Sequence, residues 1–508
     1  MSADPQREVQ DFLSDPATHG GTPVERIDTH AAMVFLAGER AFKVKRQVRF
    51  SFLDFSSLEL RRAALESELS LNRRTAPEIY LRVRRITRGV SGGLEWDSAG
   101  EIVEWVLEMR RFDQALRLDR LADAGKLTGA MIADLVDALI DLHARAEVLG
   151  APYGGAEDLE GIVRDNTADL GEWPELFPPS EVTSLDEDCW AAWRALAPLL
   201  DRRRARGWVR QGHGDLHLAN VVLWKGRPTP FDCIEFDLRF AAGDVAYDLA
   251  FLLMDLDSRG LRGFANLAMS RFFGRAGGVE ILAALPLMLA LRAAIRAKVA
   301  APAIGTQSSP EEAEKLRRSA LAFFAAARGY LKPVPSRLIA VGGLSGSGKS
   351  TLGRALAPGL GRAPGALHLR SDVLRKRLFA VPPETPLPPE AYRADVSARV
   401  YALMGEEAET ALAAGQAVIV DAVFAREEER EAVAKLAARQ GVAFTGFWLD
   451  APAEVLKRRA GERTGDASDA TPQVVERQLG YETGNIDWIR LDSSAGAEEV
   501  ARQAEERL

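Results

Sequence analysis

One short glycine-rich segment constrains the fold of this chain more than any other feature. Residues 343–350 read Gly-Leu-Ser-Gly-Ser-Gly-Lys-Ser, which matches the pattern G-x-x-x-x-G-K-[ST]. The segment follows the apolar run 338–341 and opens a helical pattern at Thr351. In such an order, backbone N–H groups and the positive end of the helix surround phosphate groups. The segment therefore predicts a nucleotide-binding unit on a parallel β-sheet.

The residues of this loop have distinct expected roles. Lys349 would place a positive charge beside the transferred phosphoryl group, and Ser350 would hold Mg²⁺. A glycine-rich turn with an incidental lysine is the alternative, and the flanking strand and helix argue against it. The other residues expected to contact the nucleotide are Gly343, Ser345, Gly346, Ser347, Gly348 and Thr351.

Two aspartates follow other strand-like runs of the same region, at the sheet edge where ligands of open parallel sheets collect. Asp372 follows the run 366–369 and could orient or deprotonate an acceptor hydroxyl, or it could cap the next helix. Asp421 follows the run 417–420 and could hold water around Mg²⁺. Three arginines farther along could form a lid over the phosphates, although each alone also fits a solvated helix: Arg458, Arg459 and Arg463.

A second group of polar residues lies near the middle of the chain. Residues 213–220 read His-Gly-Asp-Leu-His-Leu-Ala-Asn, the pattern H-x-D-x-x-x-x-N, and Asp232 follows on the next strand-like run. Phosphoryl transfer needs an acid near the accepting hydroxyl and oxygen ligands that hold Mg²⁺ against the phosphates. This segment supplies both kinds of group.

The segment 329–336, with two prolines, marks the clearest internal boundary. Before it, strand-like runs surround one helical pattern at 55–75, and helical patterns dominate from about residue 112. After it, strand-like runs alternate with helices. We predict a small lobe over 1–110, a helical lobe over 111–331, a linker at 332–336 and a P-loop unit over 337–508.

The loop 213–220 together with Asp232 resembles the aminoglycoside phosphotransferase and choline kinase family, whose members have protein-kinase-like folds and act mainly on small molecules. The resemblance spans about residues 30–331. It implies that Asp215 is the catalytic base, that Asn220 and Asp232 ligate magnesium, and that Glu235 supports the metal site.

This resemblance also implies a strand lysine on the nucleotide phosphates, held by a helix glutamate. Lys43 and Lys45 point to the same face of one predicted strand, and we prefer Lys43 while leaving Lys45 open. Glu68 is the expected partner, with Glu66 as the second choice. Met109 falls where the family places the hinge that reads adenine.

Two further stretches carry resemblances. In Ala-Gly-Asp-Val-Ala-Tyr-Asp, residues 242–248, the family resemblance places Asp244 against the catalytic loop. The phosphate loop, Arg370-Ser371-Asp372 and the stretch 421–424 resemble small P-loop kinases of the gluconate-kinase, zeta-toxin and polynucleotide-kinase kind. That likeness implies ATP-dependent phosphoryl transfer and does not name the acceptor.

The order of the two regions resembles bacterial fusion proteins described as aminoglycoside phosphotransferase and ATP-binding bifunctional proteins. It implies an α+β protein-kinase-like bilobal domain followed by an α/β P-loop NTPase domain with a parallel sheet. Each domain would use ATP and Mg²⁺ to phosphorylate a hydroxyl of a metabolite, such as a sugar or an aminoglycoside-like compound. Two alternatives stay open: one domain regulates the other, or the C-terminal domain phosphorylates 5′-hydroxyl ends of nucleic acid.

Composition narrows the set of partners. With 65 Lys plus Arg against 73 Asp plus Glu, the formal charge is −8, so there is no global basic field for nucleic acid. A local basic groove at 370–377 remains an option. The two cysteines, Cys189 and Cys233, are too few for a disulfide framework, which fits a reducing cytoplasm. We expect no membrane anchor, and the sequence leaves the oligomeric state open.

Overall fold

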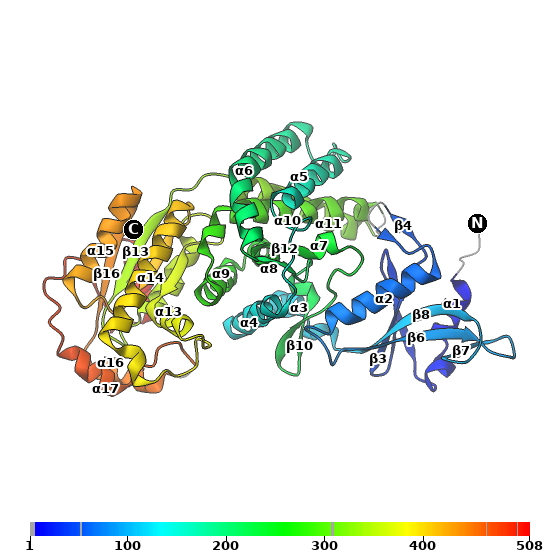
Figure 1. Cartoon of the computed structure of the whole chain (residues 1–508), viewed down its shortest axis with the longest axis horizontal. Helices are drawn as coiled ribbons and strands as arrows, with labels where there is room; N and C mark the ends of the chain where they lie inside the picture. Colours follow the sequence, from blue (N-terminus) through cyan, green and yellow to red (C-terminus); the bar gives the residue numbers. More distant parts are fainter. Residues whose placement is uncertain (1–5, 51–52, 306–308, 464, 495) are drawn as a thin grey trace. The chain divides into compact units, whose positions relative to one another are not determined.

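The computed structural model describes residues 6–50, 53–305, 309–463, 465–494 and 496–508. The chain forms two compact units, each with its own main sheet (Figure 1). Unit 1 comprises Met1–Asp158 and Asp201–Asp248, and unit 2 comprises Leu159–Leu200 and Leu249–Leu508. Among the described residues, no helix combines the length and apolar character needed to cross a bilayer.

The main sheet of unit 1 has six antiparallel strands in the order β1-β2-β3-β8-β6-β7. The predicted strand that carries Lys43 and Lys45 is β3, which pairs with β2 through a tight turn at Gly38, where φ is 56°. The strands are β1 (Val24–Asp28), β2 (Ala32–Ala37), β3 (Arg40–Lys45), β6 (Tyr80–Arg88), β7 (Leu94–Trp96) and β8 (Ile102–Arg110).

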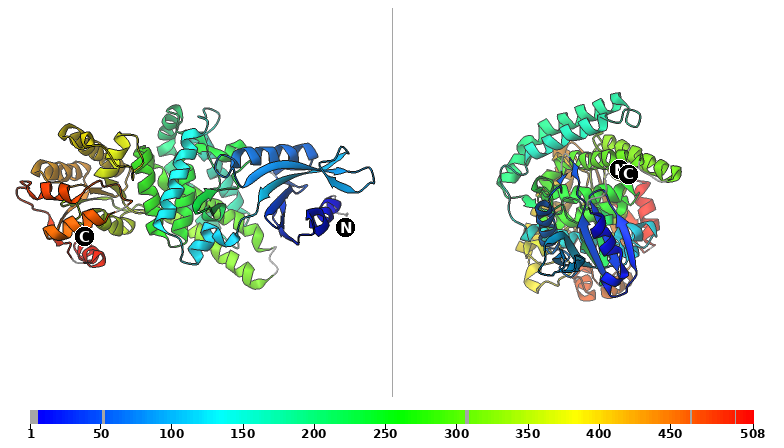
Figure 2. Two further views of the ribbon diagram at one scale, coloured as in Figure 1. Left: turned by 90° about the horizontal axis from the view of Figure 1, so that it is seen from below. Right: turned by 90° about the vertical axis from the view of Figure 1, so that its right-hand side faces the viewer.

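Two helices cover opposite faces of this sheet. The alternation of β3 turns Phe42 and Val44 toward helix α1 (Arg7–Ser14) and turns Lys43 and Lys45 toward helix α2 (Leu58–Asn72). Helix α2 lies along β6 and β8 (Figure 2). The sheet therefore presents its two lysines to a helix that carries glutamates.

The remaining elements of unit 1 are short strands and helices, several of which lie in the segment 209–244. The hairpin of β10 and β11 follows a 3₁₀ turn at Leu218–Asn220, and β9 pairs with β12. The hairpin therefore lies between the loop of Asp215 and the segment that carries Asp232. These elements are β4 (Arg49–Phe50), β5 (Leu53–Asp54), α3 (Leu118–Asp123), α4 (Gly129–Arg145), β9 (Val209–Gln211), β10 (Val221–Trp224), β11 (Arg227–Pro230), α7 (Leu238–Ala241) and β12 (Ala242–Asp244).

Unit 2 contains a five-stranded parallel sheet in the order β14-β15-β13-β16-β17. Three of the strands lie at the expected runs 338–341, 366–369 and 417–420. The fifth, β17, is an edge strand that is only half-buried, so its Ile-Arg-Leu-Asp sequence gives no continuous apolar run. The strands are β13 (Arg337–Gly342), β14 (Leu367–Arg370), β15 (Val418–Asp421), β16 (Ala443–Asp450) and β17 (Ile489–Asp492).

Helices pack on both sides of this sheet. Ile339, Val341 and Phe447 pack with residues of α12 and α18, while α14 and α15 contact β15, β13 and β16. These helices are α12 (Lys349–Leu356), α13 (Ser371–Leu378), α14 (Ala394–Ala413), α15 (Glu427–Gln440), α16 (Ala453–Glu462), α17 (Pro472–Leu479) and α18 (Ala497–Glu505).

Other helices come earlier in the chain than the segment 332–336. Helices α10 and α11 pack along each other, and Tyr330 near the end of α11 donates a 2.9 Å hydrogen bond to Asp257 of α8. Unit 2 therefore includes helices from both sides of this segment. The earlier helices are α5 (Ala156–Gly171), α6 (Pro179–Ala205), α8 (Val245–Ser258), α9 (Arg262–Ala276), α10 (Leu285–Ile304) and α11 (Pro310–Tyr330).

Candidate functional sites

In unit 1, two strand lysines share one buried glutamate. Lys43 Nζ donates to Glu68 Oε1 at 2.7 Å, and Lys45 Nζ lies 2.6 Å from Glu68 Oε2. Lys43 Nζ also lies 2.8 Å from Asp232 Oδ1, and Lys45 forms an ion pair with Glu235. The structure thus brings all five of these predicted residues together.

Glu66, the second choice for the glutamate partner, is not paired with either lysine in the described parts of the chain. Glu66 pairs with Arg62 on the exposed side of α2. Met109, the expected hinge residue, is the next-to-last residue of β8 and lies opposite Ala41 and Tyr80 of the neighbouring strands. Glu68 rather than Glu66 therefore contacts the lysines.

Charge pairing controls ionisation in this cluster. Burial opposes the charged form of Lys43, but the carboxylates of Asp232 and Glu68 outweigh it and hold the pKa of Lys43 well above its ordinary value. Desolvation also opposes ionisation of Asp232, yet Lys43 keeps the pKa of this carboxyl below its usual value. Burial raises the pKa of Glu235. The cluster therefore holds at least one charged lysine–aspartate pair at neutral pH.

Asp232 has a backbone conformation that is uncommon for a residue other than glycine, with a φ of 61°. Two buried side chains hold it there: Asp232 N donates to Tyr80 Oη at 3.1 Å, and Cys233 N donates to Asn72 Oδ1 at 2.9 Å. Such conformations persist where surrounding contacts enforce them, often at functional sites. The sequence assigned no role to Tyr80 or Asn72, although Asn72 lies in the stretch Leu71-Asn72-Arg73-Arg74, which also resembles the fusion proteins.

The loop that contains Asp215 is tightly ordered. Asn220 Nδ2 donates to Asp215 Oδ2 at 2.8 Å and to the Asp215 carbonyl at 3.0 Å. His213 Nε2 lies 3.0 Å from the Phe231 carbonyl, and His217 Nε2 lies 3.4 Å from Asp215 Oδ2. The Asp215 side chain itself is 36% exposed, so it is accessible to a substrate.

Asp248 anchors this loop, a role that the sequence analysis gave to Asp244. Its carboxylate accepts hydrogen bonds from His213 N at 2.7 Å and Gly214 N at 2.8 Å, and His143 Nε2 lies 3.1 Å away. Asp244 instead binds Arg203 through distances of 2.6 and 3.0 Å. Asp244 is the last residue of β12 and Asp248 lies in the first turn of α8, four residues later, so the sequence pattern could not separate them.

In unit 2, the glycine-rich loop has its expected geometry. Gly343, Gly346 and Gly348 have φ values of 135°, 83° and 91°. A Cβ atom on Gly346 would lie 2.4 Å from the Leu456 carbonyl, whereas a Cβ atom on Gly348 would meet no described atom within 4 Å. Ser347 Oγ is buried and has no hydrogen-bond partner among the described residues. Open space at Gly348 and the unsatisfied hydroxyl fit a loop that receives phosphate oxygens.

The residues that follow the loop meet the end of β15. Lys349 Nζ donates to the Leu344 carbonyl at 3.0 Å, and Ser350 Oγ donates to Asp421 Oδ2 at 2.5 Å. Burial lowers the pKa of Lys349. Burial opposes ionisation of Asp421, but His368, whose Nε2 lies 3.4 Å away, and Lys349 bring the pKa of Asp421 down to about 2. Asp421 is therefore a buried anion.

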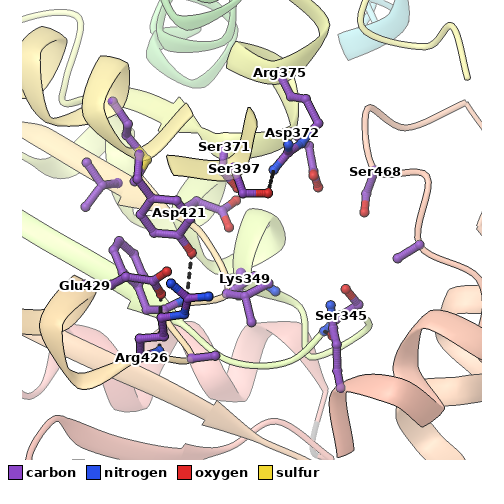
Figure 3. A pocket seen from close by; sticks show the side chains of 18 of the residues that line it. Ser345, Lys349, Ser371, Asp372, Arg375, Ser397, Asp421, Arg426, Glu429 and Ser468 are labelled. Carbon is purple, nitrogen blue, oxygen red and sulfur yellow. Dashed lines mark hydrogen bonds between the residues drawn. The ribbon is translucent and has the colours of Figure 1, made fainter. Parts of the chain in front are cut away.

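Asp372 faces the same cavity as these groups. The cavity has a volume of about 1830 Å³, and its lining includes Ser350. Figure 3 shows three further lining residues, Lys349, Asp372 and Asp421. Desolvation raises the pKa of Asp372. Helix α13 begins at Ser371, so Asp372 lies inside the first turn and is not the N-cap. The capping alternative for Asp372 is therefore excluded.

Two arginines of the expected lid, Arg459 and Arg463, differ in what they contact. Arg463 lines the cavity, whereas Arg459 Nη1 donates to the Ser493 carbonyl at 2.8 Å and does not line it. Arg370 binds Asp466 at 2.8 Å, which ties the segment after Arg463 to the end of β14. Ser345 N donates to Gln478 Oε1 of α17 at 2.8 Å, a contact that sequence reasoning missed.

Arg375 stands out among the cations of α13. Lys376 pairs with Asp469 at 2.6 Å and Arg377 with Glu407 at 2.5 Å. Arg375 is 7% exposed and lines the cavity, and no carboxylate in the described parts of the chain pairs with it. Its nitrogens donate to the Ala391 carbonyl and to Ser397, and Nε has no partner among the described residues (Figure 3). The cavity wall thus carries a buried guanidinium that stacks on the Tyr392 ring and forms no ion pair within the described residues.

The oxygen-rich donors of both sites suit magnesium. In unit 1, Asn220 accepts a backbone hydrogen bond from Phe231, the neighbour of Asp232, and in unit 2 Ser350 binds Asp421. The described residues contain no cluster of three or more His, Cys, Asp or Glu side chains placed to hold a metal. Mg²⁺ sites usually combine one or two protein ligands with phosphates and water.

Two family models match the chain. The phosphotransferase enzyme family matches residues 92–279, and the AAA domain family matches residues 338–483. Among solved structures, a choline/ethanolamine kinase family protein from Mesorhizobium loti is 14% identical, with a TM-score of 0.40, and the match covers 64% of this chain and 99% of that one. A sugar kinase from Janibacter sp. HTCC2649 is 23% identical, with a TM-score of 0.25, covering 34% and 94%.

Two mycobacterial relatives match most of the chain. They are "Uncharacterized protein Rv2004c" of Mycobacterium tuberculosis (strain H37Rv) and "Uncharacterized protein Mb2027c" of Mycobacterium bovis. Each is 30% identical over 447 residues, which cover 85% of this chain and 84% of the relative. The chain therefore belongs to the family of these proteins, and it is a kinase that joins a phosphotransferase-family domain to a P-loop kinase domain.

Proposed function

We propose that this chain is an ATP- and Mg²⁺-dependent bifunctional kinase, in which each domain transfers the γ-phosphate of ATP to a hydroxyl of a small metabolite. The observation that carries the proposal is the convergence of Lys349, Ser350, Asp421 and Asp372 on one cavity. We assign the first activity to residues 1–331 and the second to residues 337–508.

In the C-terminal site, the loop amides and Lys349 would bind the phosphates of ATP. Ser350 and Asp421 would hold magnesium, which neutralises charge on the transferring group when bound. Asp372 would accept the proton of the acceptor hydroxyl. Its raised pKa supports this role, because a base works best when its pKa approaches the operating pH.

In the N-terminal site, Lys43 held by Glu68 would pair with ATP phosphates. Asp232 and Asn220 would hold magnesium, with Glu235 and Lys45 supporting Asp232 from behind. Asp215 would orient or deprotonate the acceptor, because its carboxylate is exposed and Asn220 fixes its position. A charged Asp232 is favoured by its lowered pKa.

The acceptors are small hydroxyl compounds, for which sugars and aminoglycoside-like compounds are the first candidates. For the C-terminal site, the unpaired guanidinium of Arg375 favours an acceptor that also carries a carboxylate or phosphate group.

The test uses the purified full chain with ATP, Mg²⁺ and a panel of sugars, sugar acids, aminoglycosides, nucleosides and 5′-hydroxyl oligonucleotides, with products followed by mass. Asp215→Ala and Lys349→Ala run beside the wild type. Two working kinases predict that each variant loses a different product or that one accumulates a singly phosphorylated compound. If every product survives one of the substitutions, that domain regulates or binds and the bifunctional proposal fails. Products from oligonucleotides alone would instead identify a nucleic-acid end kinase.

A further inference from the structure

The parallel sheet of unit 2 has an edge that another part of the chain covers. Strand β14 is the first strand in the sheet order, and among the described strands it pairs with β15 alone. An edge strand presents backbone N–H and C=O groups that lack strand partners. Here the side chains of α9 reach these groups, although α9 precedes β14 by about ninety residues of sequence.

A stripe of small and polar residues on α9 makes these contacts. Asn266, Ser270 and Gly274 are spaced four residues apart and so lie on one face of the helix. Asn266 Nδ2 donates at 2.8 Å to the carbonyl of Ala366, the residue before β14. His368 N of β14 donates to Ser270 Oγ at 3.1 Å. Asn266 is 4% exposed. Two side chains thus take the place of a neighbouring strand.

The same face of α9 continues onto α13. A Cβ atom on Gly274 would lie 3.0 Å from Val373 Cγ1, so only a glycine allows the present approach of the two helices without a shift. The adjacent Phe273 carbonyl accepts a 2.9 Å hydrogen bond from Arg377 Nη1. Val373 directly follows Asp372, so α9 contacts the turn that carries the proposed acceptor base.

His368 extends the contact to the other acid of the site. Its backbone N–H binds Ser270, while its imidazole Nε2 lies 3.4 Å from Asp421 Oδ2. The imidazole also packs on α12, because a Cβ atom on Gly353 would lie 2.4 Å from His368 Nε2. One residue of β14 therefore joins α9 to the metal-side acid and to the helix after the phosphate loop.

We propose that α9 is a positioning element of the C-terminal kinase site, and that Ser270, Asn266 and Gly274 fix Asp372 and Asp421 through β14 and α13. The inference rests on the proposed function of that site and goes beyond it. Helix α9 falls within residues 92–279, which match the phosphotransferase family, so the C-terminal site is completed by a helix assigned to the other domain.

The test compares two identical substitutions on the same helix of the full chain. Gly274→Ala places a methyl group against Val373, whereas Gly263→Ala points one where no described atom lies within 4 Å. Both replace a helical glycine, so their effects on helix propensity match. Ser270→Ala removes the hydroxyl that accepts from His368 N, and Ser270→Thr restores it. All variants are made in the Asp215→Ala background, so that only C-terminal turnover of ATP is measured.

We expect Gly274→Ala and Ser270→Ala to lower kcat by about threefold to tenfold, because small displacements of catalytic groups reduce rates steeply. The KM for ATP should stay within about twofold, since the phosphate loop itself is untouched. Gly263→Ala and Ser270→Thr should match the background protein. Equal kcat values in all four variants would overturn the proposal. It would also be overturned if the control Gly263→Ala lost as much kcat and thermal stability as Gly274→Ala.

Hydrogen–deuterium exchange provides a readout that needs no kinase activity. Amides of residues 366–378 should exchange about tenfold faster in Gly274→Ala and Ser270→Ala than in Gly263→Ala. If exchange rises but kcat does not, α9 is a structural cover and the positioning proposal is wrong. If the background protein shows no ATP turnover or product at all, the proposed kinase function fails, and unchanged exchange would then reject the bracing by α9 separately.

Discussion

Ser350 and Asp421 are joined across the C-terminal site by a hydrogen bond in which Ser350 Oγ donates to Asp421 Oδ2 at 2.5 Å. The pair links the helix after the phosphate loop to the end of a neighbouring strand. Both oxygens suit magnesium. Replacing Asp421 by Asn should therefore weaken the binding of Mg²⁺ without removing the acceptor of this hydrogen bond. We expect the Mg²⁺ concentration for half-maximal C-terminal turnover to rise about tenfold or more. The measurement is a Mg²⁺ titration in the Asp215→Ala background, and an unchanged midpoint would contradict the assignment.

The C-terminal rate should depend on the ionisation of Asp372. Desolvation raises the pKa of this carboxyl, so its active, ionised form appears at higher pH than for an ordinary aspartate near about 3.9. We expect kcat to rise with pH along an acid limb that lies above that value. The measurement is a pH–rate profile of Asp215→Ala, with Lys349→Ala showing the profile of the other site alone. A limb at or below the ordinary value would argue against Asp372 as the base.

Replacing each of the two lysines of β3 by methionine should affect a different property of the protein: turnover for Lys43 and stability for Lys45. Lys43→Met removes the cation beside Asp232 and should lower N-terminal turnover by about a hundredfold. Lys45 is 3% exposed and pairs with both Glu68 and Glu235, so Lys45→Met leaves buried carboxylates uncompensated and should cost about 3 kcal/mol of unfolding free energy. Denaturant unfolding and product formation are measured on both variants. Equal effects on both measurements would show that the lysines are interchangeable.

Gly212 permits the contact between Asp248 and the loop of Asp215. A Cβ atom there would lie 2.1 Å from Asp248 Oδ2, whereas one on Gly243 would approach nothing closer than 3.8 Å. Gly212→Ala should therefore displace Asp248 and lower N-terminal turnover by about tenfold or more, while Gly243→Ala should have little effect. Both variants are assayed in the Lys349→Ala background. Similar rates for the two would exclude Asp248 as the anchor of this loop.

Arg375 should select among C-terminal acceptors. Arg375→Ala is expected to raise the KM for acceptors that carry a carboxylate or phosphate by about tenfold, because a charged hydrogen bond is lost. The KM for uncharged acceptors and for ATP should change little. Steady-state kinetics with matched pairs, such as a sugar acid and its parent sugar, make the comparison. A uniform rise in KM across both members would point to a structural role for this guanidinium.

Local sequence patterns predicted the structure best where a motif fixes the order of strand, loop and helix along the chain. The glycine loop of residues 343–350 and the lysines of β3 lie where strand and helix periodicity placed them, and Glu68 rather than Glu66 meets the lysines. Their roles and the domain boundaries stay predictions. Contacts between distant segments were not readable, because they depend on tertiary packing. Asn72, Tyr80 and Asp248 hold the N-terminal loops, yet each looks like an ordinary helix or strand residue.

The cover that α9 provides for β14 bears on how the chain is made. Translation proceeds from the N-terminus, and early segments fold first. Helix α9 is therefore already synthesised when β14 leaves the ribosome, and the open edge of the sheet has a partner within its own chain from the outset. A gene with its two halves exchanged would expose that edge during synthesis, where it could pair with other nascent chains. We therefore expect the present order of the two halves to limit aggregation during synthesis.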